Sequence, residues 1–197
     1  MTNFSKIALC AMVIGAGTLF TSCNDSDDPA PVQLSLYDKL GGETLVADPT
    51  HPGQMIEHGR LSYRCVVDST ITLIVADIVN GANGNLGAHF APIAGEVFGP
   101  DMNTTNVAIL SDNLTDFFSF NTGGTNAVNT YSGLSMANAH NPAVNSRMGA
   151  KASPANYDKF EGYVVAAAAL NGVTDPTIVG EVGTVLESLR STIVQTQ

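Results

Sequence analysis

The chain from residue 153 onward constrains the fold most, because two apolar helical patterns follow each other there between clear start signals. Ser153 is a typical N-cap, and Pro154 suits the first turn of the helix that it would begin. "NGVTDP" interrupts the pattern, and Asp175 can cap a second helix. The apolar residues share one face of each helix: Tyr157, Phe160, Val164, Ala167 and Ala168 in the first, and Ile178, Val179, Val182, Val185, Leu186, Leu189 and Ile193 in the second. We therefore expect two amphipathic helices at the C-terminal end.

The region before them combines helical patterns with irregular stretches. Residues 62–79, "SYRCVVDSTITLIVADIV", are rich in β-branched residues, which favours a strand, but their length and apolar spacing favour the buried helix that we expect. Residues 43–60 are expected to form an irregular insertion loop, and residues 80–105 a loop with short helical turns. Residues 104–120 place apolar side chains at helical spacing: Val107, Leu110, Leu114, Phe117 and Phe118. The sequence thus predicts an all-α domain with loop insertions.

The N-terminus has the features of a targeting segment. A basic residue, an apolar run too short to cross a membrane comfortably and small residues precede Cys23, which resembles a bacterial lipoprotein signal. We expect residues 1–22 to be the signal peptide and residues 23–35 an acidic linker or lipid tether, followed by one domain over residues 36–197. Acyl chains on Cys23 would hold the protein to a membrane. This predicts a lipid-anchored protein of the cell envelope, in the outer membrane or periplasm, and the acidic run after Cys23 favours export to the cell surface.

Net charge and cysteine content limit which classes of partner and which disulfide bonds we expect. The formal net charge is −10 at pH 7, from 8 basic and 18 acidic residues. Nucleic acid and anionic lipid surfaces are therefore poor partners. If Cys10 is removed with the signal and Cys23 is acylated, Cys65 has no internal disulfide partner, and we expect it to be a small buried hydrophobe.

The segment "YSGLSMANAHN" raises the question of a ligand, because it contains His140, one of four histidines. A single histidine is more often solvated or hydrogen-bonded than bound to a metal, and its neighbours alone do not decide between these roles. The order of the surrounding segments is more specific, and it resembles that of the group 1 truncated haemoglobins. The similar segments are "LYDKLGG" (36–42), "VVDSTITLIVAD" (66–77), "TNVAILSDNLTDFF" (105–118) with the glycine pair 123–124, "YSGLSMANAH" (131–140), "MGAKASPANYDKFEGYVVAAAALNGV" (148–173) and "VLESLRSTIV" (185–194).

This resemblance implies a two-over-two helical sandwich that encloses haem b. His140 would be the proximal iron ligand, and the opposite coordination position would remain open for oxygen or another diatomic gas. Each glycine pair would let a helix end sharply.

The resemblance also implies roles for further residues that would contact the cofactor. Phe90 would pack against the porphyrin face, Tyr131 beside its edge and Met136 beneath it, although an ordinary core position remains the alternative for Phe90. Phe117 and Phe118 match an aromatic pair of which one lines the ligand tunnel, and both could be core residues. The positions that look into the gas pocket match Leu110 and Leu114.

The sequence departs from the family at the gas pocket. Many members have a tyrosine on the second helix and a polar residue on the distal helix, where this chain has Ile71, Leu110 and Leu114. An apolar pocket lacks a hydrogen-bond donor for the bound gas, which is worth about 1.5–3 kcal/mol. We therefore predict fast oxygen release and autoxidation, and poor nitric-oxide dioxygenation.

Two insertions, at about residues 43–60 and 78–104, carry or adjoin the other histidines. His89, next to Phe90, is the best candidate for a sixth iron ligand, with a solvated loop histidine as the alternative. The spacing of His51 and His58 is compatible with a weak surface metal site.

Three functional hypotheses follow. The leading one is an oxygen- or gas-binding carrier, which needs no catalytic residue beyond the iron ligand and so is not an enzyme. The second is a haem-dependent peroxidase or nitric-oxide detoxifying enzyme, which would need a separate reductase because the chain has no "GxGxxG" motif. The third is a surface lipoprotein that captures haem. A hydrolase is disfavoured because no "GxSxG" motif occurs.

Overall fold

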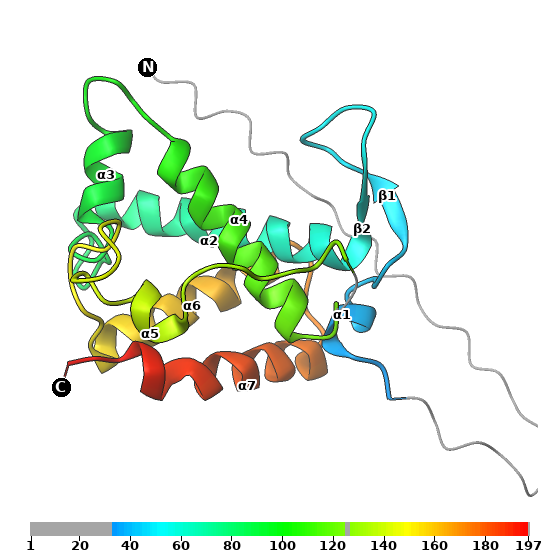
Figure 1. Cartoon of the computed structure of the whole chain (residues 1–197). Coiled ribbons are helices and arrows are strands. Elements are labelled where there is room, and N and C mark those ends of the chain that lie inside the picture. Colours follow the sequence, from blue (N-terminus) through cyan, green and yellow to red (C-terminus); the bar gives the residue numbers. More distant parts are fainter. Residues whose placement is uncertain (1–32, 125–126, 197) are drawn as a thin grey trace, which may run out of the picture.

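The structure, a computed structural model, describes residues 33–124 and 127–196. This part of the chain is mostly helical, with one small hairpin (Figure 1). Its elements are α1 (Leu36–Lys39), β1 (Leu45–Ala47), β2 (Met55–Glu57), α2 (His58–Val79), α3 (Ala91–Val97), α4 (Thr105–Asn121), α5 (Met136–Ala139), α6 (Pro154–Leu170) and α7 (Pro176–Ile193).

The four long helices lie where the apolar spacing predicts them, and their caps explain where two of them begin. The Ser153 side chain accepts a hydrogen bond from the backbone of Asn156, and the Asn156 side chain accepts one from Ser153 in return. The Asp175 side chain accepts a bond from the backbone of Thr177 at the start of α7. Polar groups at the starts of α6 and α7 thus satisfy backbone N–H groups that have no partner within the helix.

The expectation of an irregular loop over residues 43–60 is wrong in part, because this stretch contains an antiparallel hairpin. β1 and β2 pair with Leu45 opposite Glu57, Val46 opposite Ile56 and Ala47 opposite Met55. Asp48, just after β1, accepts hydrogen bonds from Thr50 and from both terminal nitrogens of Arg64 in α2. This contact across 16 residues fastens the hairpin to the helix, and local sequence pattern cannot reveal it.

The helices pack around α2, which contacts both α4 and α6, while α7 packs against α6 and α5. In Figure 1, α4 crosses α2 at an angle, and α7 runs along the lower side of the molecule. Aromatic side chains fill the centre: Tyr37 stacks on Tyr63 with ring centroids 6.4 Å apart, and Tyr63 stacks on Phe118 at 5.9 Å. Leu186 of α7 completes this core and is 2% exposed.

The predicted signal peptide, residues 1–22, and most of the predicted linker lie outside the described residues. Within residues 33–124 and 127–196, no helix has the length and apolar character needed to cross a membrane.

Cys65 is buried in α2, as expected, but it is disulfide-bonded. The expectation that it has no internal partner is therefore wrong for the whole chain. That expectation assumed a chain that has lost Cys10 and whose Cys23 is acylated, whereas the whole chain retains all three cysteines. Cys10 and Cys23 lie outside the described residues.

Candidate functional site

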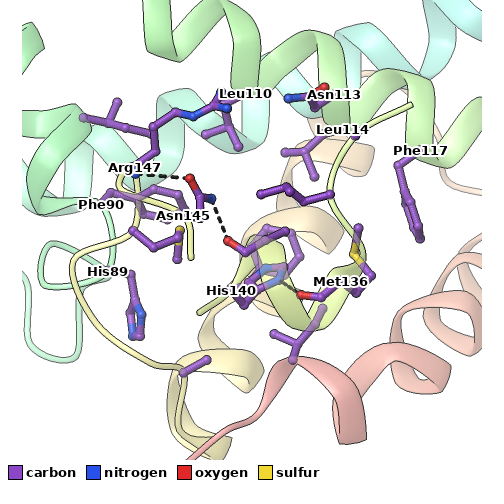
Figure 2. Close-up of a pocket in the computed structure, with 18 of the residues that line it drawn as sticks. His89, Phe90, Leu110, Asn113, Leu114, Phe117, Met136, His140, Asn145 and Arg147 are labelled. Atoms are coloured by element: carbon purple, nitrogen blue, oxygen red, sulfur yellow. Dashed lines mark hydrogen bonds between the residues drawn. The ribbon is translucent and has the colours of Figure 1, made fainter. Parts of the chain in front are cut away.

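A cavity of about 500 Å³, called here the main cavity, lies between α4, α5, α6 and the loops that precede α3 and α6. Most of its lining side chains are apolar, and its volume is in the range of about 300–1,000 Å³ that is usual for cofactor and small-molecule sites. Figure 2 shows residues of α4 on one side of the main cavity and His140 on the other.

The structure brings six of the seven predicted cofactor-contacting residues together in the wall of the main cavity. They come from the start of α3, from α4, from the segment before α5 and from α5 with the residue after it. These residues are Phe90, Leu110, Leu114, Tyr131, Met136 and His140, and Phe117 lines the same cavity.

His140 lies at the C-terminal end of α5, a short helix whose N-cap is Ser135. The Nδ1 atom of His140 is 2.9 Å from the backbone carbonyl oxygen of Met136, one helical turn earlier (Figure 2). Because a carbonyl oxygen only accepts hydrogen bonds, Nδ1 must carry the proton, and the lone pair is then on Nε2. Metal-ligating histidines commonly have this arrangement, in which one ring nitrogen is held by a carbonyl and the other binds the metal.

The protonation state of His140 also suits a ligand. Burial lowers the pKa of His140 below its ordinary value, and a nearby His89 adds to this effect. The imidazole is therefore neutral at pH 7, and only a neutral imidazole can donate its lone pair to a metal.

His89 lines the main cavity as well and is 6% exposed. Its Nδ1 atom is 2.9 Å from the carbonyl oxygen of Ala150, so Nδ1 donates a hydrogen bond to that oxygen. The backbone of Gly149 donates to the carbonyl of His89 at 2.7 Å, which holds the loop before α6 against the start of α3. The two insertion histidines His51 and His58 do not line the main cavity.

Phe118 does not line the main cavity, although it was predicted to contact the cofactor. It lies in the core against Tyr63 and lines a separate apolar cavity of about 40 Å³. Adjacent residues of a helix point about 100° apart, and here that offset directs Phe118 toward Tyr63 in the core. Phe117 is the one that faces the main cavity, where its ring meets Tyr131 edge-on at 5.3 Å.

The residues predicted to form the gas pocket also lie in two different cavities. Leu110 and Leu114 line the main cavity, whereas Ile71 lines a cavity of about 30 Å³ between α2, α3 and α4. Asn113 also lines the main cavity, so the wall formed by α4 is less apolar than predicted. Its position three residues after Leu110, on nearly the same helical face, is the signal that could have identified it.

Two further polar residues of the main cavity come from the loop before α6, and sequence reasoning missed both. Asn145 donates from Nδ2 to the carbonyl of Ala139, the residue before His140, at 2.7 Å. The Asn145 Oδ1 atom accepts a hydrogen bond from the backbone of Arg147 at 3.1 Å (Figure 2). Asn145 therefore links the end of α5 to the loop that carries Arg147.

Within the described part of the chain, no three His, Cys, Asp or Glu side chains gather into a group that could hold a metal ion. No family model matches this chain, and no curated protein is significantly similar to it in sequence.

Proposed function

We propose that this protein is a haem-binding globin of the truncated type, in which His140 ligates the iron of haem b and a diatomic gas such as oxygen binds reversibly. The observation that carries the proposal is the state of His140. A neutral imidazole, with Nδ1 held by the Met136 carbonyl, lines a mostly apolar cavity of about 500 Å³.

The residues around the main cavity fit such a cofactor. A porphyrin is a large, flat, apolar group, and Phe90, Leu110 and Leu114 offer it apolar surface, with Met136 beside His140. A porphyrin supplies most of the iron's ligands itself, so the protein needs to contribute one nitrogen, as His140 can. When bound, haem supplies an iron with a coordination position for a small ligand.

The packing of the helices supports a two-over-two arrangement. α2 lies against α4, and α6 lies against α7, while the short α5 carries His140 between α4 and α6 in the chain order. A globin-type sandwich is the arrangement we propose for these two pairs. The sequence before residue 36 supports a lipid anchor on Cys23 in the cell envelope, with no nucleic-acid partner.

The test is an absorption spectrum of the purified whole protein with added haemin, first oxidised, then reduced, then under carbon monoxide. We expect a one-to-one complex with the bands of histidine-ligated haem and a shift when carbon monoxide binds. His140→Ala should weaken haemin binding by at least about 100-fold, more than the loss of an outer ligand partner costs. His51→Ala, an exposed histidine outside the main cavity, is the matched control and should bind as the unaltered protein does. A protein that stays colourless with excess haemin, or that gives the same spectrum after His140→Ala, would overturn the proposal.

A further inference from the structure

Arg147 stands apart from the other arginines of this acidic chain. The chain has 18 acidic and 8 basic residues, and Arg60, Arg64 and Arg190 each form an ion pair with a carboxylate. Among the described residues, the guanidinium of Arg147 forms neither an ion pair nor a hydrogen bond, although the chain has more acidic than basic residues. This guanidinium therefore retains all five of its N–H donors for another partner.

The position of Arg147 indicates where that partner would lie. Arg147 lines the main cavity, and no other Lys, Arg, Asp or Glu among the described residues does so. Its side chain is partly buried, and Figure 2 shows it reaching from the loop before α6 toward α4. A partly desolvated cation at the wall of an apolar cavity is stabilised when an anionic group of the bound ligand pairs with it.

The loop holds this arginine in place from both sides. The Arg147 backbone N–H donates to Asn145, which is in turn bonded to Ala139 at the end of α5. Two residues later, Gly149 is bonded to the carbonyl of His89. The same loop thus connects Arg147 to both histidines of the main cavity, so a group that pairs with Arg147 would belong to the ligand that His140 contacts.

From these contacts we propose that Arg147 binds a carboxylate of the cavity's ligand, and that the site selects apolar molecules that carry such a group. This inference rests on the proposed function, in which the carboxylate is a propionate of haem. A planar guanidinium can hold a carboxylate through two parallel hydrogen bonds, and this makes it selective for that group over an ester. A long-chain fatty acid has the same chemistry, an apolar body with one carboxylate, and is the other source to be distinguished.

The experiment compares the affinities of the whole protein for haemin and for haemin dimethyl ester, in which both carboxylates are blocked. The unaltered protein should prefer haemin by about tenfold or more, the effect expected of a charge-assisted hydrogen bond. Arg147→Gln should remove that preference by weakening haemin binding while leaving the affinity for the ester unchanged. Arg147→Lys keeps the charge without the planar fork and should retain part of the preference. Lys151→Gln, an exposed cation outside the main cavity, is the control and should behave as the unaltered protein.

The outcomes separate this inference from the proposed function. If haemin binds through His140 but Arg147→Gln prefers haemin over the ester as strongly as the unaltered protein, the carboxylate site is wrong and the haem proposal stands. If haemin does not bind at all, the haem proposal fails, and a titration with palmitate decides the carboxylate site. Palmitate binding that falls at least about tenfold in Arg147→Gln would support that site, and its absence, or an unchanged affinity, would overturn it.

Discussion

Asn129 donates a hydrogen bond from Nδ2 to Oε2 of Glu57 at 2.7 Å, and so joins two residues that lie 72 positions apart. Tyr37 donates to the same oxygen at 2.5 Å, and both Tyr37 and Asn129 are fully buried. Glu57 is the residue just before the first residue of α2, whereas Asn129 comes two residues before Tyr131. The network therefore holds the segment that supplies Tyr131 to the main cavity against the first two helices.

Asn129→Ala should lower the free energy of unfolding by about 1–3 kcal/mol, because it removes a donor from a buried carboxylate. Urea denaturation followed by circular dichroism measures this change. Asn83→Ala, in an exposed loop, is the control and should leave the stability within about 0.5 kcal/mol of the unaltered protein. Equal stability of the two variants would show that the network contributes nothing.

The hairpin gives a prediction about pH. Hydrogen bonds from the Arg64 guanidinium hold the pKa of Asp48 well below its ordinary value, with further help from Thr50 and His51. A carboxyl whose pKa is lower in the folded state stabilises the fold above its unfolded pKa of about 4, and the contribution disappears as the pH falls below that value. Asp48→Asn should thus cost about 1–3 kcal/mol at pH 7, with a difference that shrinks between about pH 4 and pH 2.

Urea denaturation of the unaltered protein and of Asp48→Asn across that pH range tests this expectation. Asp101→Asn, an exposed carboxylate, serves as the control. A difference between Asp48→Asn and the unaltered protein that is constant down to pH 2 would contradict the assignment to the ionised carboxylate.

The first glycine pair gives a prediction about backbone geometry. Gly41 has φ +116°, and a Cβ atom there would lie 2.5 Å from the ring of His58. Gly41→Ala should therefore cost more than about 1–2 kcal/mol through backbone strain and the clash. Gly162→Ala, inside α6 with open space around the added Cβ, should instead raise stability by about 0.5–1 kcal/mol. Thermal melts of both variants compare the two signs directly, and a stabilising Gly41→Ala would contradict the turn geometry.

The gas pocket gives a prediction that depends on haem binding. Leu110 lines the main cavity from α4, so Leu110→Gln would add a donor facing a bound gas. We expect oxygen release to slow by about 10- to 100-fold, as a hydrogen bond to a partly charged acceptor provides about 1.5–3 kcal/mol. Stopped-flow displacement by carbon monoxide measures the rate, with Leu110→Met as a size-matched control without a donor. If Leu110→Gln releases oxygen as fast as Leu110→Met, the side chain does not face the bound gas.

Local sequence determined the helices and their ends. The capping residues Ser153 and Asp175 and the apolar spacing of residues 104–120 specify backbone structure through groups only a few positions away, and the structure has these helices where the pattern predicts them. Ser135 caps the start of the short α5 in the same way, and His140 directly follows the last residue of that helix. Its hydrogen bond to Met136 spans one helical turn and is therefore also local.

Only the tertiary structure decided which of these residues share a cavity. Phe117 and Phe118 are equivalent as apolar residues in a helix, and the packing of Tyr63 and Tyr131 separates them into core and cavity wall. No local sequence pattern singles out Arg147. Among the described residues its guanidinium has no carboxylate partner, and only the folded structure shows this. Contacts between residues distant in the chain depend on how complete helices pack, and a pattern of near neighbours contains no information about that packing.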